Sequence, residues 1–220
     1  MDRGLNLAAM HKAPILILLL ALGACNAIKQ PATMISDWSN DWRQVATPAD
    51  RARLRDWRGA FSDALAAARR AGHAADIARE GALLAPDAAI GGGLPNGDYA
   101  CRIVKLGAKA TGLLDYIAYP AFRCRVTPVR DLQRLAKVGG SQRVVGLIFP
   151  ADAMRGVLLG TLVLGDERRA LQYGQDETRD VAAYVERIAP NRWRLVIPRP
   201  HFESQLDVIE LIPAPEGTGR

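Results

Sequence analysis

Two cysteines in a strongly alternating stretch constrain this chain more than any other feature. Across residues 99–126, side-chain types alternate with a period of two, which is the pattern of β-strands. A turn at 111–112 would place Cys101 opposite Cys124, with their Cβ atoms within bridging distance. The stretch therefore predicts a β-hairpin closed by a disulfide. The first strand would carry four side chains on one face: Tyr99, Cys101, Ile103 and Lys105.

The N-terminus resembles a bacterial lipoprotein signal. Basic residues precede a short apolar run at 13–22, which ends in Leu-Gly-Ala before Cys25. We expect residues 1–24 to be removed and Cys25 to be lipidated, with translation starting at Met1 or Met10. The apolar run is too short for a lasting transmembrane helix. The alternatives are an uncleaved N-terminal anchor and a plain secretory signal.

Cysteine usage agrees with this interpretation. The chain has three cysteines, and an odd thiol in an oxidising compartment needs an explanation. Lipidation of Cys25 would leave the pair Cys101 and Cys124. Closing a loop of about 22 residues should stabilise the fold by about 3 kcal/mol in the loop-entropy description. Asn26 after the lipidated cysteine favours the periplasmic face of the outer membrane over the inner membrane.

The remaining chain, about 196 residues, is long enough for one domain with a sizeable core. Its net charge is about +5 once the leader is removed, and the arginines are interspersed with acidic residues. This pattern favours a solvated surface, with some attraction to anionic lipid, and no nucleic-acid partner is expected.

The first part of the mature chain is expected to be helical. Residues 25–41 predict a flexible tether, and 42–90 a helical segment. Thr47 and Pro48 can begin one helix that carries an apolar stripe and ends at Gly72. Trp57 on that stripe should seal the helix against the following domain. The glycine-rich stretch 87–98 lacks a phosphate-binding motif and is interpreted as a flexible joint.

Residues 97–213 predict a domain of antiparallel strands, followed by a disordered tail at 214–220. Runs at 144–149 and 157–164 are continuously apolar, which predicts burial on both faces. Residues 130–138 could form one or two helical turns, and 171–174 a short edge strand. Segments 181–188 and 192–197 predict a hairpin with Trp193 facing inward and Arg192 and Arg194 outward. The fold class is α+β: a helical segment packed on an antiparallel barrel or sandwich of seven to eight strands.

The sequence offers little catalytic chemistry. HExxH, GxSxG, paired CxxC and EF-hand spacings are absent from it, so neither a metal site nor a cofactor is predicted. His201 and Glu203 would share a face in a strand and are weak candidates for a general base or half a metal site. A hydrogen-bonded loop histidine is the preferred interpretation. Five acidic residues are interpreted as a solvated hairpin tip rather than a calcium site because arginines separate them: Asp166, Glu167, Asp176, Glu177 and Asp180.

Several segments together resemble the bacterial domain of unknown function 4893 family over nearly all of the mature chain. They are Thr-Pro-Ala-Asp-Arg at 47–51, Leu-Leu-Asp-Tyr at 113–116, Tyr-Pro-Ala-Phe-Arg-Cys at 119–124, Pro-His-Phe-Glu-Ser at 200–204 and Asp-Val-Ile-Glu at 207–210. The family has no established activity, so the resemblance implies no catalytic residues.

Taken together, these features predict a membrane-anchored periplasmic lipoprotein that binds rather than transforms its partner. The barrel could hold a small amphipathic ligand. Alternatively, a packed barrel could bind an envelope protein, resembling the small lipoproteins that inhibit lysozymes or proteases. The third alternative is a cell-envelope hydrolase using His201 and Glu203.

Overall fold

The structure is a computed structural model that describes residues 39–215. The expected signal peptide, Cys25 and nearly all of the tether lie outside the described residues, as does most of the tail. The barrel and the helices that cover it belong to one compact unit. The helices and strands given below all lie within this unit.

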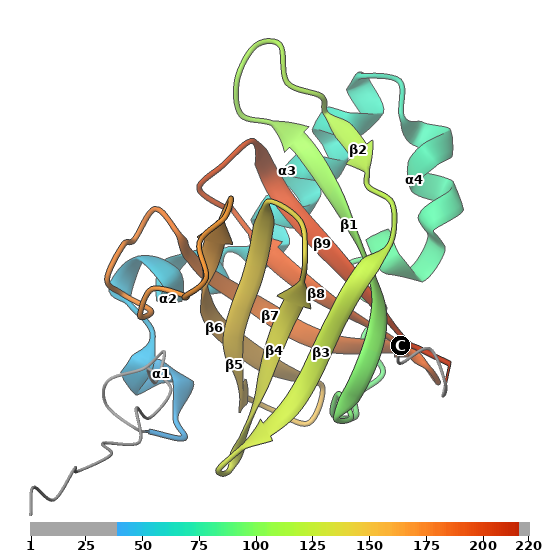
Figure 1. Ribbon diagram of the computed structural model, residues 1–220. Coiled ribbons are helices and arrows are strands. Elements are labelled where there is room, and N and C mark those ends of the chain that lie inside the picture. The colour runs from blue at the N-terminus through green and yellow to red at the C-terminus, as the bar shows by residue number, and fades with distance from the viewer. Residues whose placement is uncertain (1–38, 216–220) are drawn as a thin grey trace, which may run out of the picture. The chain divides into compact units, whose positions relative to one another are not determined.

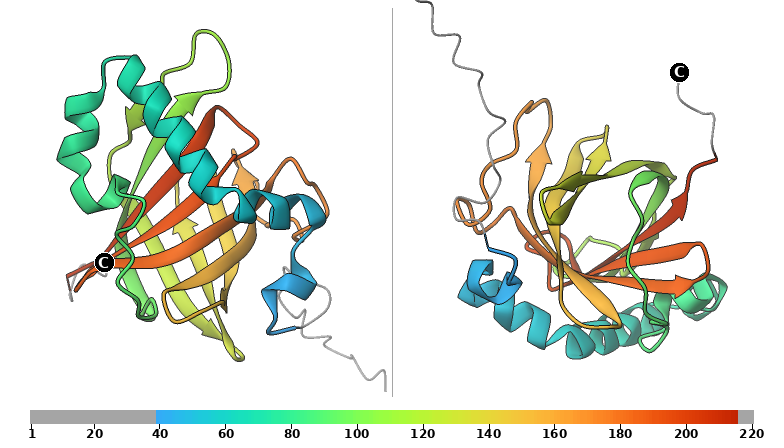
Figure 2. Two further views of the ribbon diagram at one scale, coloured as in Figure 1. Left: turned by 180° about the vertical axis from the view of Figure 1, so that it is seen from behind. Right: turned by 90° about the horizontal axis from the view of Figure 1, so that it is seen from below.

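Eight antiparallel strands close into a barrel, as the sequence led us to expect (Figures 1 and 2). Each of the eight barrel strands pairs with the next barrel strand along the chain, and pairing of β1 with β9 closes the barrel. A ninth strand, β2 (Tyr116–Ala118), pairs with the C-terminal half of β1. The barrel strands are β1 (Gly97–Ala108), β3 (Phe122–Val129), β4 (Leu132–Val138), β5 (Gln142–Pro150), β6 (Arg155–Leu164), β7 (Asp180–Ala189), β8 (Arg192–Pro198) and β9 (Ser204–Pro213).

The continuously apolar strands β5 and β6 are buried on both faces, which confirms the prediction. Val144 and Leu158 face the barrel interior, whereas Val145 and Leu159 face the helices outside. Gly146 and Gly160 lie opposite each other. A Cβ on either would collide with the backbone of the neighbouring strand, so this strand pair needs glycine there.

The helices cover the outside of the barrel (Figure 2). They are α1 (Trp42–Val45), α2 (Pro48–Arg55), α3 (Trp57–Arg70), α4 (Ala74–Glu80) and the 3₁₀ turn η1 (Gly81–Leu84). Trp57 and Phe61 of α3 pack against Val104, Val196 and Val208 on the outer face of β1, β8 and β9. Trp57 therefore seals the helix against the barrel, as predicted.

The single helix expected from Thr47 to Gly72 is in fact two helices. Asp56 leaves the helical conformation between α2 and α3, with ψ of 9°. Its carboxylate accepts a hydrogen bond from Arg199 in the β8–β9 loop, 3.1 Å away. Gly59 leaves room for that carboxylate, because a Cβ there would collide with it. The apolar stripe alone did not indicate this break.

The disulfide between Cys101 and Cys124 is present, with the Cα atoms 5.9 Å apart. The predicted register was wrong by two residues, because Cys124 pairs with Tyr99 and Cys101 with Phe122. The return segment is interrupted between β2 and β3, which moves β3 along β1. A shift of two keeps both cysteines on the interior face, so the bridge still forms diagonally.

Two further expectations were wrong. Residues 132–138 form strand β4 instead of helical turns, with Leu132 on the outer face and Leu135 inside. Residues 171–174 form a turn rather than an edge strand. Arg194 points away from the barrel interior, as predicted; what the sequence did not indicate is that η1 covers it and leaves it fully buried.

Candidate functional site

One half of the barrel interior is packed and closed. Tyr99 and Trp193 meet edge to face with their ring centroids 6.3 Å apart, and Leu94 packs against the same core. Trp193 Nε1 donates to the carbonyl of Gly93 at 3.0 Å, and Tyr99 Oη donates to that of Pro95 at 2.6 Å. The glycine-rich stretch expected to be a flexible joint therefore plugs this end of the barrel.

The other half contains a cavity of about 420 Å³, here called the mouth cavity. Its size is typical of small-molecule sites, which measure roughly 300–1,000 Å³. Four segments border its opening: the segment before β3, the β4–β5 turn, the β6–β7 loop and the β8–β9 loop. Its walls are largely apolar and are formed by Ile103, Phe122, Val144, Leu162, Val181, Ile197 and Ile209.

A buried lysine with two carboxylates lies in the wall of the mouth cavity. Lys105 and Asp207 face each other across β1 and β9, with Nζ 3.1 Å from Oδ2. Glu203 Oε2 lies 3.1 Å from the same Nζ. Ser204 Oγ donates to the second oxygen of Asp207. Both oxygens of the Asp207 carboxylate therefore have a partner, and the Lys105 ammonium forms ion pairs with both Asp207 and Glu203.

The pKa values of this group reflect its burial. Desolvation opposes the charge on Lys105, but Asp207 and Glu203 outweigh it and raise the pKa of the lysine. Burial also raises the pKa of Asp207 above its usual range, although Lys105 and Ser204 act in the opposite direction. A buried charged pair of this kind requires each partner, since either one alone would be strongly disfavoured.

A second lysine faces the same cavity from β4. Lys137 Nζ donates to the carbonyl of Gln142 at 2.7 Å and lies 4.3 Å from the ring centre of Phe122. Burial lowers the pKa of Lys137, and repulsion from Lys105 and Arg143 lowers it further. Within residues 39–215, Lys137 makes no ion pair with a carboxylate, unlike Lys105.

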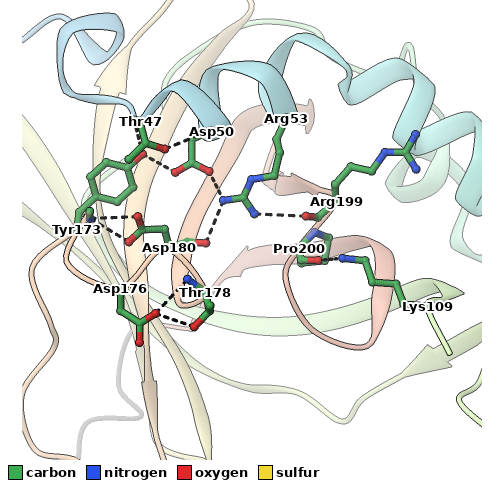
Figure 3. A network of polar contacts seen from close by, with 11 residues as sticks. Thr47, Asp50, Arg53, Lys109, Tyr173, Asp176, Thr178, Asp180, Arg199 and Pro200 are labelled. Carbon is green, nitrogen blue, oxygen red and sulfur yellow. Dashed lines mark hydrogen bonds and ion pairs between the residues drawn. The ribbon is translucent and has the colours of Figure 1, made fainter.

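A polar network beside the opening fastens helix α2 to two loops (Figure 3). Asp50 is completely buried; it pairs with Arg53 and accepts a hydrogen bond from Tyr173 Oη in the β6–β7 loop. Arg53 also donates to the carbonyls of Arg199 and Asp180, each at 3.3 Å. The network holds the β6–β7 and β8–β9 loops against the same helix.

Thr47 begins this network and caps helix α2, as predicted. Its hydroxyl accepts from Asp50 N at 3.1 Å, and its own N–H donates to Tyr173 Oη at 3.1 Å. Asp180 accepts from the backbone N–H of Gly174 at 3.0 Å, and burial raises the pKa of Asp180 to about 6. The sequence signal for the network was the cap alone, because Tyr173 and Asp180 are far from Thr47 along the chain.

His201 and Glu203 both line the mouth cavity, but they lie in the β8–β9 loop and not in a strand. No hydrogen bond joins them among the described residues, and Glu203 instead pairs with Lys105. Although His201 is an exposed residue, partial desolvation of its ring, followed by the charge of Arg53, lowers its pKa. The arrangement does not couple a base to a second catalytic group.

Lys105 and Lys137 were not identified as site residues from the sequence. For Lys105 a signal existed, because the alternation places it on the same face as Cys101 and Ile103. A charged residue on an interior face is unusual and indicates a partner or a cavity. Lys137 could not be placed, because its segment was interpreted as helical.

Of the five acidic residues expected to form a solvated hairpin tip, Glu167 and Asp176 are paired with arginine, whereas the expectation was wrong for Asp180, which is buried. Arg179 lies 2.7 Å from Glu167 and 3.2 Å from Asp176. Within the described part of the chain, no group of three or more His, Cys, Asp or Glu side chains is arranged to hold a metal ion. In the same residues, the helices are too short or too polar to span a bilayer.

Comparison with known proteins gives one match. No curated protein and no solved structure is significantly similar to the chain. A family model described as Domain of unknown function (DUF4893) matches residues 42–211, which include every described helix and all but the last residues of β9. The chain therefore belongs to the domain of unknown function 4893 family.

Proposed function

We propose that this protein is a lipoprotein on the periplasmic face of a bacterial membrane, and that its barrel binds one small amphipathic molecule in the mouth cavity. The observation that carries the proposal is the cavity itself, which is closed at one end, apolar along its walls and polar at a few positions. An eight-stranded barrel is just wide enough to hold one small ligand.

The anchoring part of the proposal rests on the leader sequence and on the cysteines. Because Cys101 and Cys124 are bridged, Cys25 is the remaining thiol of the chain. A disulfide of this kind is typical of proteins in oxidising compartments. We expect the protein to incorporate a radiolabelled or clickable fatty acid in bacteria, and Cys25→Ala to abolish the label. Incorporation that persists in this variant would contradict lipidation at Cys25.

Binding can be tested with a neutral fluorescent probe such as N-phenyl-1-naphthylamine, whose emission rises in apolar surroundings. We expect the protein beginning at Asn26 to enhance that emission in a saturable manner. Ile209→Trp should abolish the enhancement, because Ile209 lines the mouth cavity. Ile212→Trp is the matched control, since this residue lies on the same strand but is exposed. Equal binding by both variants would contradict binding in the mouth cavity.

A protein partner is the second candidate function, and one observation favours it. Leu113 and Leu114 are exposed in the loop that follows β1, with 42% and 62% of their surface accessible. Exposed apolar side chains beside one another are typical of protein contact sites. Loss of capture of an envelope protein on Leu113→Ser and Leu114→Ser substitution, with probe binding retained, would support this function.

A further inference from the structure

We propose that the ligand of the mouth cavity is a single-chain amphipathic anion whose head group lies between Lys105 and Lys137. This inference rests on the proposed binding function and names the class of ligand. The chain of the ligand would lie against the apolar walls, below the two ammonium groups.

The first argument is the unbalanced charge of Lys137. Its ammonium faces the cavity, and its contacts within residues 39–215 are a neutral carbonyl and an aromatic ring. Lys105 and Arg143 repel it, and burial lowers its pKa. An anionic group placed beside Lys137 would offset both the repulsion and the cost of burial, because an opposite charge stabilises a partly desolvated ammonium. A cationic ligand would add a third repulsive charge.

The second argument is that one carboxylate on Lys105 is replaceable. Asp207 is buried and held by Ser204, whereas 42% of the Glu203 side chain is exposed at the opening. Glu203 also has a φ of 63°, a left-handed conformation that is uncommon for a residue with a side chain. A ligand anion could take the position of Glu203 on Lys105, while Glu203 turns into water. The local charge at Lys105 would be unchanged by that exchange.

The third argument is the separation of polar and apolar surface in the cavity. Lys105 lies above Ile103 on β1, and Asp207 lies above Ile209 on β9, because alternate residues share a face. The ionic groups are therefore nearer the opening and the aliphatic groups are deeper. A molecule with one charged end and an aliphatic chain matches this order.

The test is isothermal titration calorimetry of the protein beginning at Asn26 with four twelve-carbon ligands below their micelle concentrations. They share a chain and differ in head group: dodecanoate, dodecyl phosphate, dodecanol and dodecylammonium. We expect either anion to bind about tenfold or more tightly than dodecanol, since hydrogen bonds to charged groups contribute more than neutral ones. The tighter of the two anions would assign the head group as carboxylate or phosphate.

Two substitutions localise the effect. Lys137→Met should weaken binding of the anions about tenfold and leave dodecanol unchanged, and it leaves no described carboxylate without its partner. Lys109→Met is the matched control, because Lys109 donates to the carbonyl of Pro200 and does not line the cavity. Glu203→Gln should strengthen binding of the anions, because the side chain that competes with the ligand for Lys105 would no longer be charged. Thermal unfolding of each variant verifies that it is folded.

The outcomes separate this inference from the proposed function. Equal affinity for dodecanol and the anions, or tightest binding of dodecylammonium, would overturn the anion proposal and leave ligand binding intact. Unchanged anion affinity in both Lys137→Met and Glu203→Gln would also overturn it. Failure of all four ligands to bind would overturn the proposed function itself.

Discussion

Replacing Arg194 by methionine should destabilise the protein severely, although this arginine points outward from the barrel, as the sequence predicts. Both Arg194 and Glu186 have fully buried side chains, with Nη2 2.7 Å from Oε2. The guanidinium also donates to the carbonyls of Leu83 and Ala85 at 2.8 Å each. One side chain thus joins the barrel wall to the 3₁₀ turn η1.

The magnitude follows from what the substitution leaves behind. Methionine would fill much of the space but would leave Glu186 with Arg155 as its remaining cationic partner, 3.2 Å away. Removing one partner of a buried ion pair costs about 3–5 kcal/mol. For a domain of this size each kcal/mol lowers Tm by about 2–4 °C, so a decrease of about 6–20 °C is expected.

The assay is urea denaturation followed by tryptophan fluorescence, with the disulfide intact. Arg123→Met is the control, because Arg123 is an exposed residue of β3; it should change the free energy of unfolding by less than about 0.5 kcal/mol. Adding Glu186→Leu to Arg194→Met should restore part of the loss, because no buried carboxylate then lacks its partner. A loss below about 1 kcal/mol for Arg194→Met, or no restoration in the double variant, would refute the reasoning.

Three further predictions concern stability. Thr47→Ala removes the cap of α2 and should cost about 1 kcal/mol, measured as a decrease in Tm of about 2–4 °C; an unchanged Tm would contradict the capping role. Replacing Cys101 and Cys124 by alanine should cost about 3 kcal/mol in urea denaturation, and a variant as stable as the parent would contradict the loop-entropy reasoning. The raised pKa of Asp180, about 6, means that the folded chain retains a proton that the unfolded chain releases. Its contribution to stability is therefore present below about pH 4 and lost as the pH rises to about 6, and Asp180→Asn should flatten this part of the Tm profile. A profile that Asp180→Asn leaves as steep as before would assign the dependence to another group.

The period-two alternation predicted which residues share a face of a strand, because successive side chains of a strand point to opposite faces. It placed Cys101 and Cys124 correctly inside, and it did not fix their register, which depends on where β2 ends and β3 begins. In β4, Leu132 and Leu135 are three residues apart and resembled a helical stripe. They in fact pack on opposite faces of one strand.

The alternation also could not show what covers each face. Arg194 points outward as predicted but meets η1, a contact between segments more than 100 residues apart. The candidate site was likewise only partly visible in the sequence. Lys105 was detectable as a charge on an interior face, whereas its grouping with Glu203 and Lys137 depends on closure of the barrel. Sequence patterns therefore predicted most of the strands and the faces of their residues, whereas tertiary contacts determine how the site is assembled.

Native mass spectrometry of the protein beginning at Asn26, secreted to and purified from a bacterial periplasm, tests the central claim most directly. We predict a reproducible added mass that corresponds to one small amphipathic molecule and is lost in Ile209→Trp but retained in Ile212→Trp. An added mass that survives Ile209→Trp, or an unmodified mass in a protein that also fails to bind the neutral probe, would contradict a ligand-binding barrel.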